Sequence, residues 1–195
     1  MRLLFHCCCG PCSLAAVESL CAEGADLTLF WHNPNIHPFT EYRSRLESLR
    51  TFADHKGLPL EIGGEYGLYE FVEKVGPETA FGTRCNVCYR MRLEKTAARA
   101  AELGLDAFST SLLISPYQQQ ETIRQIGEEL AERYGVAFFY RDFRPLFREG
   151  QGKARELGLY MQKYCGCIFS EADRYAGKGA KAGAKAEGKK EGRPR

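Results

Sequence analysis

The sequence predicts an α/β protein in which helices cover both faces of a parallel sheet of about five strands. Short apolar runs alternate along the chain with longer amphipathic stretches, and this alternation is typical of strand–helix–strand units that build a parallel sheet. The unusual stretches HCCCGPC, NPNIHP and SPYQQQ each follow an apolar run. Parallel sheets bind ligands beyond the carboxyl ends of their strands, so we expect these stretches to share one edge.

Each strand is predicted from a short apolar run, such as RLLF near the start of the chain and LTLFWH after it. Runs of this length, bounded by turn-forming residues, indicate strands that are buried on both faces. The expected strands cover residues 2–5, 27–32, 58–63, 107–114 and 136–143.

Each helix is predicted from apolar residues that recur every three or four positions. Leu14, Val17 and Leu20 have this spacing directly after the first strand, and Cys21 would join them on the inner face as a core thiol. The stretch CYRMRLEKTAARAAELG ends on a glycine, which is a common helix stop. The expected helices cover residues 12–23, 40–57, 66–75, 88–103, 120–135 and 152–164.

The composition indicates one globular domain followed by a basic tail. No apolar stretch approaches the ~20 residues of a membrane helix, and the first residues lack the ~7–15 apolar positions of a secretory signal. We therefore expect no membrane association and a cytoplasmic location. The net charge of +2 is unevenly distributed along the chain. The tail from Gly177 carries seven Lys or Arg and two Glu, a net charge of +5. Residues 1–176 therefore have a net charge of 2 − 5 = −3.

We accordingly expect a single α/β catalytic domain at residues 1–175 and a basic, disordered tail at residues 176–195. The Gly/Ala/Lys composition of the tail has no apolar pattern from which a core could form. The tail would then serve as a solubilising extension, or it would attract nucleic-acid phosphates weakly.

Nine cysteines are many for a chain in a reducing compartment, where thiols point to metal binding or catalysis rather than to structural disulfides. Apart from Cys21 they form three clusters in the sequence, which are HCCCGPC at residues 6–12, CNVC at residues 85–88 and CGC at residues 165–167.

The first cluster allows three interpretations. Cys9-Gly-Pro-Cys12 is identical to the CGPC dithiol motif of thioredoxin, and a thiol at a helix N-terminus suits disulfide exchange. The second CxxC at residues 85–88 argues against this interpretation, because thioredoxin needs no second CxxC. Four thiolates from two clusters would also close a tetrahedral zinc site. Consecutive cysteines fit an iron–sulfur cluster better, because each thiolate can bind a different iron. The spacing favours iron–sulfur and leaves zinc as the alternative.

The spacing of Cys165 and Cys167 is too tight for two ligands of one ion in most geometries. A strained and exposed disulfide would be labile and redox-active. The alternative is two loop thiols without a common role.

Polar residues beside these motifs are candidates for binding a substrate. Tyr117 and Gln118 would offer an aromatic surface and an amide to a nucleobase, and the cations around the second CxxC would stabilise an anionic cluster or hold phosphates. Each of these residues also has an ordinary structural explanation, such as a turn or a helix start. The candidates are Asn33, His37, Arg84, Tyr117, Gln118 and Asp142.

Five blocks of the sequence occur in the order found in the cobalamin-independent epoxyqueuosine reductases, and they span nearly residues 1–172. The blocks are HCCCGPCS, NPNIHPFTEYRSRLESL, RCNVCYRMRLEKTA, TSLLISPYQQQETI and YRDFRPLFREGQGKARELGLYMQKYCGCIFSE. The resemblance implies a Rossmann-like fold of the adenine-nucleotide-hydrolase type. It also implies the last step of queuosine synthesis, in which the epoxide oxygen of epoxyqueuosine in a tRNA anticodon loop is removed.

The resemblance implies cofactors and their ligands as well. Members of this family carry a 4Fe-4S cluster, which would fall on Cys8, Cys9, Cys85 and Cys88, and a further mononuclear iron. The position after Pro11, which is Cys12, would bind that second iron. The family's CGC, proposed as a redox-active disulfide, falls on Cys165 and Cys167, and the electron donor stays unknown. Cys7 departs from the family pattern, so it leaves open a ligand register shifted by one residue.

Two other functions are compatible with parts of the sequence. PP-loop tRNA-modifying enzymes resemble this fold, but they need an SGGxDS phosphate loop where this chain has Cys-Cys-Gly-Pro-Cys-Ser. A zinc-stabilised RNA-binding module without catalytic activity is the other alternative, and the colour of the purified protein would separate it from an iron–sulfur enzyme.

Overall fold

Five parallel strands form the central sheet of the computed structural model, which describes residues 1–176. The strands are β1 (Arg2–His6), β2 (Asp26–Trp31), β3 (Leu60–Ile62), β4 (Ala107–Thr110) and β5 (Ala137–Phe138), and their order in the sheet is β3-β2-β1-β4-β5. This order is that of Rossmann-like sheets. The predicted parallel α/β fold is thereby confirmed.

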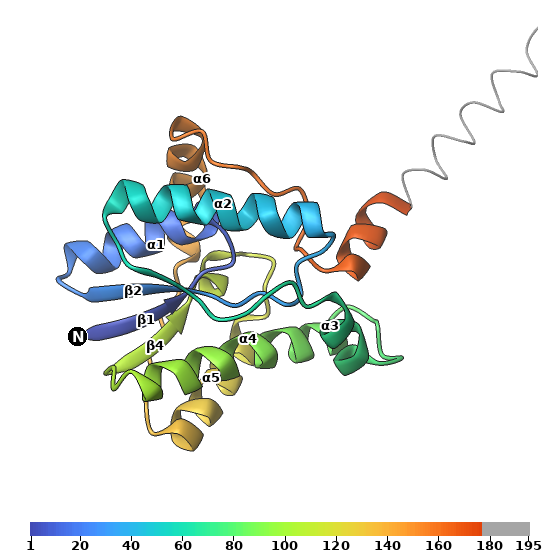
Figure 1. The fold of residues 1–195 in the computed structure, drawn as a ribbon, viewed down its shortest axis with the longest axis horizontal. Coiled ribbons are helices and arrows are strands. Elements are labelled where there is room, and N and C mark those ends of the chain that lie inside the picture. Colours follow the sequence, from blue (N-terminus) through green and yellow to red (C-terminus); the bar gives the residue numbers. More distant parts are fainter. Residues whose placement is uncertain (177–195) are drawn as a thin grey trace, which may run out of the picture.

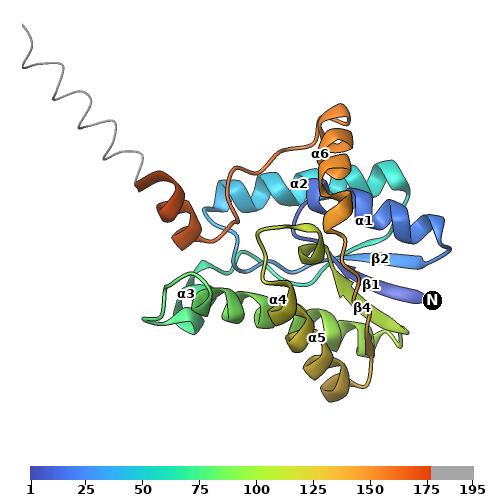
Figure 2. The same ribbon diagram turned by 180° about the vertical axis from the view of Figure 1, so that it is seen from behind.

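Helices cover both faces of the sheet, as predicted. Figure 1 shows one layer above the sheet and one below it, and Figure 2 shows the same two layers from behind. The upper layer consists of α1 (Gly10–Ala22), α2 (Phe39–Lys56) and α6 (Phe147–Glu156), and the lower layer of α3 (Leu68–Val75), α4 (Thr83–Glu102) and α5 (Gln120–Tyr134). None of the helices in the described part of the chain is long and apolar enough to cross a membrane.

The core lies along the central strand β1, where Leu3, Leu4 and Phe5 are all fully buried. Successive side chains of a strand point to opposite faces, so complete burial of neighbours requires a helix layer on each side. Each such side chain contributes about 1.5–3 kcal/mol of transfer free energy. This burial explains why β1 is apolar without alternation.

Several predicted boundaries are wrong. The fourth strand ends at Thr110, whose hydroxyl accepts the amide N–H of Leu112 and starts the 3-10 helix η1 (Ser111–Ile114). The fifth strand covers only Ala137–Phe138 and pairs with β4 over these two residues. A second 3-10 helix, η2 (Arg144–Leu146), follows β5.

The last predicted helix, at residues 152–164, is displaced. Helix α6 begins at Phe147 and ends at Glu156, because Gly158 adopts a left-handed conformation with φ of +66°. Residues 157–167 form a loop without helix or strand, and residues 168–176 are helical again. The predicted division at residues 175 and 176 stays a prediction, because most of the tail lies outside the described residues.

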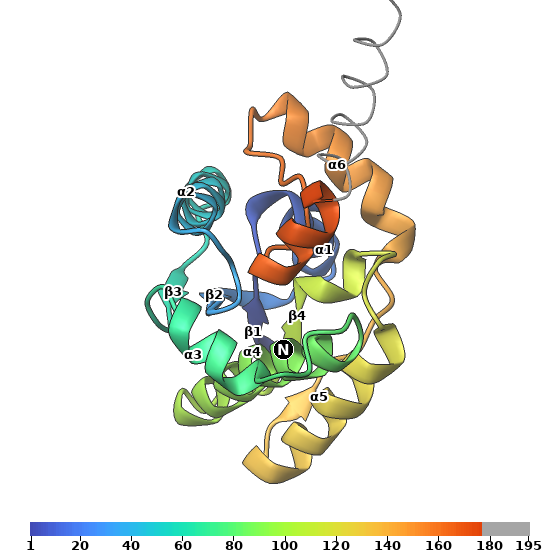
Figure 3. The ribbon, with the colours of Figure 1, turned by 90° about the vertical axis from the view of Figure 1, so that its right-hand side faces the viewer.

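The strand order reverses between β1 and β4 at the centre of the sheet. At such a point the connections leave in opposite directions and a crevice opens beyond the strand ends. The cysteine-rich loop follows β1, η1 follows β4, and helical residues 168–176 lie beyond the same ends (Figures 1 and 3). The fold thus brings the first and the last cysteine cluster to one edge.

Candidate functional site

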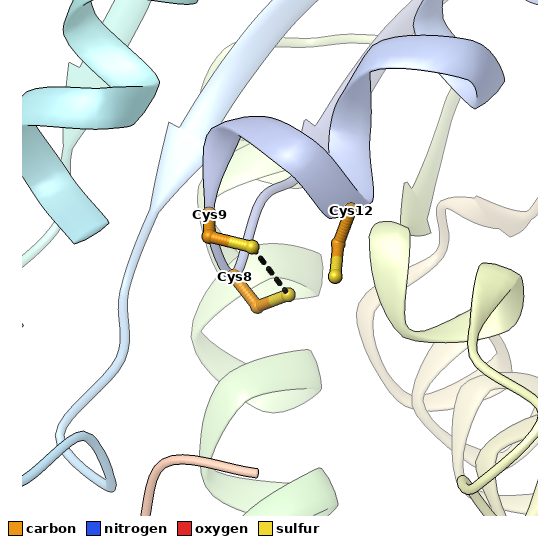
Figure 4. A group of neighbouring side chains, drawn as sticks. All are labelled: Cys8, Cys9 and Cys12. Carbon is orange, nitrogen blue, oxygen red and sulfur yellow. Dashed lines mark hydrogen bonds between the residues drawn. The ribbon is translucent and has the colours of Figure 1, made fainter. Parts of the chain in front are cut away.

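The turn from β1 into α1 places three thiols in one group. Cys9 precedes the helix and Pro11 occupies its first turn, where a missing N–H costs nothing. Gly10 is required there because a Cβ would lie 2.7 Å from the carbonyl oxygen of Ser48 on α2. The Sγ atoms of Cys8, Cys9 and Cys12 all lie within 4.8 Å of one another, and Figure 4 shows them pointing toward one another.

The three thiols share hydrogen bonds that favour one thiolate. Hydrogen bonds with Cys12 and Cys9 hold the pKa of Cys8 well below its usual range, and the charge of Arg92 adds to this. Burial raises the pKa of Cys9, and the hydrogen bond to Cys8 raises that of Cys12. Metal ions bind thiolates rather than thiols. The low pKa of Cys8 therefore favours binding of a metal cation by this group.

The geometry of the thiol group fits a metal. The Sγ atoms of Cys8 and Cys9 are 3.8 Å apart, and two thiolate ligands of one tetrahedral ion with bonds of about 2.3 Å lie about 3.8 Å apart. The four cysteines expected to hold an iron–sulfur cluster provide the all-thiolate donor set that such a cluster takes. The residues present therefore fit metal coordination.

Cys7 and Cys21 lie outside this group. The thiol of Cys7 donates a hydrogen bond to the carbonyl oxygen of Phe5 (3.3 Å), and burial raises its pKa to about 12. The prediction that Cys21 is a core thiol is wrong, because its side chain is exposed near the end of α1.

The second CxxC lies in the first turns of α4, which begins five residues earlier than predicted. Gly82, with φ of +95°, directly precedes the helix. Both cysteines lie within the helix, where Cys85 is half-buried and Cys88 is buried. The Nη2 of Arg92 donates to Cys88 Sγ (3.0 Å) and its Nε to the Cys88 carbonyl oxygen (3.1 Å). Burial raises the pKa of Cys88 to about 12.

Arg92 lies between the cysteine clusters. It is 2% exposed, and within residues 1–176 it forms no ion pair with a carboxylate. A buried guanidinium without an anion is costly. Burial lowers the pKa of Arg92, but the nearby cysteines Cys88, Cys165 and Cys8 outweigh this effect and hold that pKa above its usual value.

Cys165 and Cys167 belong to the loop after α6, and both are free thiols. Cys165 is exposed and its Sγ accepts a hydrogen bond from Gln118 Nε2 (3.4 Å), whereas Cys167 is buried. Arg45 on α2 fixes this loop by donating to the carbonyl oxygens of Tyr164 and Cys165, both at 2.9 Å.

A cavity of about 400 Å³ opens among these groups. Its size lies within the range of small-ligand sites. The thiols of Cys8, Cys12 and Cys165 contribute to its wall, together with Tyr117 and Gln118. A larger hollow of about 580 Å³ lies over α4 and α5, but no cysteine lines it.

Gln162 and Arg45 are site residues that sequence reasoning missed. The Nε2 of Gln162 donates to Cys12 Sγ (3.0 Å), and its Oε1 accepts from the thiol of Cys9 (3.3 Å). The only signal in the sequence was that Gln162 stands within the long block that ends in CGC. Nothing near Arg45 in the sequence distinguishes it from other helix arginines.

The structure brings two of the predicted substrate contacts, Tyr117 and Gln118, to the cavity. Tyr117 is 76% exposed, and the amide oxygen of Gln118 accepts a hydrogen bond from Tyr89 (2.7 Å). Tyr117 is therefore accessible to a ligand in the cavity, whereas both amide atoms of Gln118 already have partners in the protein. The role of both residues stays a prediction.

The other four predicted substrate contacts do not line the cavity. Asn33 and His37 are buried and hydrogen-bonded to the protein. Arg84 pairs with Asp173, and Asp142 pairs with Arg144 at the surface. Their contact with a substrate remains a prediction to which the structure adds no support.

Comparison with known proteins identifies relatives over nearly the whole chain. The family model "Epoxyqueuosine reductase QueH" matches residues 3–173. The curated epoxyqueuosine reductase QueH of Dehalococcoides mccartyi is 37% identical over 93% of this chain and 98% of its own length. That of Thermotoga maritima is also 37% identical, over 88% of this chain and 91% of its own length.

Among solved structures, a predicted subunit of tRNA methyltransferase from Methanocaldococcus jannaschii matches with a TM-score of 0.53 at 15% identity. The match covers 80% of this chain and 75% of that one, and it supports the fold alone.

Proposed function

The chain belongs to the QueH family of epoxyqueuosine reductases, and on that premise we propose that it removes the epoxide oxygen of epoxyqueuosine in the anticodon loop of a tRNA. The observation that carries the proposal is the cavity in which the thiols of Cys8, Cys12 and Cys165 meet exposed Tyr117. In the reaction both carbon–oxygen bonds of the epoxide break and a carbon–carbon double bond forms. The epoxide takes up two electrons and two protons, and the oxygen leaves as water.

We propose that Cys8, Cys9, Cys85 and Cys88 hold a 4Fe-4S cluster and that Cys12 helps to hold a further iron. The support is the group formed by the thiols of Cys8, Cys9 and Cys12, the low pKa of Cys8 and the cation of Arg92 beside Cys88. When bound, such a centre supplies single electrons and a Lewis acid for the departing oxygen. Gln162 orients two of the thiols, as the hydrogen-bonding partners of metal ligands generally do.

We propose that Cys165 and Cys167 supply the electron pair. When the two thiols close a disulfide they release two electrons and two protons, which balances the deoxygenation. An external two-electron donor then restores the thiols. The support is the position of Cys165 on the cavity wall and its hydrogen bond from Gln118.

The double variant Cys165→Ser/Cys167→Ser tests this role. We expect it to lose multiple turnovers and to retain one turnover after chemical reduction, measured as queuosine formed per chain in digested tRNA. Cys21→Ser is the matched control, because Cys21 is exposed and lies near the end of α1, whereas the thiol group lies at its start. Full steady-state activity of the double variant would refute the electron-supply role and leave the reductase assignment standing.

One observation favours a zinc-stabilised RNA-binding module as the second candidate. The 3.8 Å separation of the Cys8 and Cys9 sulfurs equals that of two ligands of a single ion. A protein purified without oxygen should be brown and contain iron and acid-labile sulfide if the reductase proposal is right. A colourless protein that contains one zinc per chain would favour the module.

A further inference from the structure

The cavity is strongly basic, although the domain around it is not. Four of the residues that line it carry a positive charge, and none carries a carboxylate. Residues 1–176 have a net charge of −3, obtained by subtracting the tail's +5 from the total of +2. Charges of one sign that line a cleft concentrate the potential there. The cationic residues are Arg45, Arg92, Lys163 and Arg174.

Two of these four cations are buried in the wall of the cavity, and the other two are exposed at its rim. Arg45 and Arg92 are 1% and 2% exposed, and protein groups already accept their hydrogen bonds. Lys163 and Arg174 are exposed at the rim. Neither forms an ion pair within the part of the chain that the structure describes, whereas exposed cations such as Arg124 and Arg133 have a carboxylate within 4 Å. Within residues 1–176 the rim therefore carries two cations that pair with no carboxylate.

The segment that carries Arg174 is held in place. Asp173, its neighbour, forms an ion pair with Arg84, which is 5% exposed and also lies over the ring of Phe169 at 5.9 Å. Helical residues 168–176 are thereby attached to the start of α4. This gives Arg84 a positioning role, and its predicted contact with a substrate stays a prediction.

An aromatic side chain completes the rim. Tyr117 is 76% exposed and contacts Phe147 edge-on, with the ring centroids 6.3 Å apart. An exposed aromatic ring beside uncompensated cations is the combination with which proteins bind single-stranded RNA, because the ring stacks on a base and the cations bind phosphates. An anticodon loop presents this chemistry.

We propose that Lys163 and Arg174 bind the backbone phosphates that flank the nucleoside inside the cavity. The proposal rests on the proposed function, since only a nucleoside that is part of an RNA brings phosphates to the rim. The two cations fix the position of the RNA and contribute no base selectivity. Recognition of the base falls to the side chains deeper in the cavity.

The test is the salt dependence of binding to a fluorescently labelled tRNA transcript. Each of Lys163→Gln and Arg174→Gln should weaken the affinity several-fold, and each should reduce the slope of log Kd against log salt by about 1. Arg174→Lys should keep the slope, because it keeps the charge. The tail is present in every variant, so its contribution cancels from the comparison.

Lys95→Gln is the matched control, because Lys95 is exposed on α4, forms no ion pair within residues 1–176 and does not line the cavity. It changes the net charge equally and should leave the slope as it is. Wild-type slopes in the two rim variants, or an equal loss in Lys95→Gln, would overturn the proposal. Reduction of modified tRNA by the wild-type chain is measured separately, so failure of the rim and failure of the reductase function are distinguishable.

Discussion

Neighbouring cysteines in the triplet point in different directions, and these directions bear on which of them could bind a metal. The thiol of Cys7 bonds back to the carbonyl oxygen of Phe5, while Cys8 and Cys9 turn toward Cys12. The sequence raised the question of a ligand register shifted by one residue. The side-chain directions favour Cys8 and Cys9 as the ligands.

Two serine variants test this register. Cys7→Ser should retain the iron content of the wild type, because a serine hydroxyl can also donate to the Phe5 carbonyl oxygen, whereas Cys8→Ser should lose most of it. Iron and acid-labile sulfide per chain are measured after anaerobic purification. Loss of iron in Cys7→Ser with retention in Cys8→Ser would show that the register is shifted.

Arg92 is the second residue whose role depends on its surroundings rather than on its motif. From the sequence, three cations near the second CxxC looked equally suited to the metal centre, namely Arg84, Arg90 and Arg92. In the fold, Arg90 pairs with Glu129 and Arg84 with Asp173, while Arg92 donates to Cys88 Sγ. The sequence could not make this distinction, because both carboxylates are distant from the motif along the chain.

Removing the charge of Arg92 should lower the reduction potential of the bound cluster. A positive charge favours the form that has gained an electron, so Arg92→Met should shift the potential downward by tens of millivolts or more. Arg92→Lys keeps the charge and should shift it less. A spectroelectrochemical titration measures the potentials, and an unchanged value in Arg92→Met would exclude charge compensation by this residue.

At the scale of elements, the loop of residues 157–167 is the segment that the sequence described least well. Helical periodicity placed a helix at residues 152–164, yet the chain leaves the helix after Glu156. The contacts that hold the loop cross long stretches of sequence, since Arg45 is 120 residues from Cys165 and Cys12 is 150 from Gln162. Local pattern predicts strands and helices and carries no information on such pairs.

Loss of the Arg45 guanidinium should destabilise the protein. Arg45 is 1% exposed and forms an ion pair with Glu41 (2.7 Å), so Arg45→Met leaves a buried carboxylate without its partner. The expected loss of unfolding free energy is about 3–5 kcal/mol, measured by urea denaturation. Adding Glu41→Gln should recover part of it, and a single variant as stable as the wild type would show that the pair does not anchor the loop.

Helical residues 168–176, which follow the loop, are attached through His37 to the segment between β2 and α2. Its Nδ1 accepts from the amide N–H of Ile168 (3.2 Å), so its Nε2–H donates to the Pro34 carbonyl oxygen (2.9 Å) and the ring is neutral. Burial lowers the pKa of His37 to about 4. Protonation would remove the acceptor on which Ile168 depends.

This arrangement predicts a stability that falls in acid. Between pH 6.5 and about 4 the unfolded chain binds a proton at this position and the folded chain does not, so the free energy of unfolding decreases as the pH falls. His37→Gln should flatten this part of the profile, whereas His55→Gln, which changes an exposed histidine, should not. Urea denaturation at several pH values checks it, and identical profiles for the wild type and His37→Gln would contradict it.

At the scale of the whole molecule, the alternation of apolar runs and helices was sufficient to predict the parallel sheet. The positions of the unusual stretches after strands then placed the cysteine loop and Tyr117 at one edge, as found. What the pattern could not supply is which residues face the cavity. Asn33 and Tyr117 both follow strands, but one is 1% exposed and the other 76%.

The central claim is that this cysteine-lined cavity reduces epoxyqueuosine with the help of bound iron. The most direct measurement is mass spectrometry of nucleosides from epoxyqueuosine-containing tRNA after anaerobic incubation with the reduced chain, with and without prior removal of iron by a chelator. We predict that the iron-loaded chain converts epoxyqueuosine to queuosine, with loss of one oxygen atom, and that the iron-free chain does not. Conversion without iron, or none by a chain fully loaded with iron and sulfide, would contradict the account.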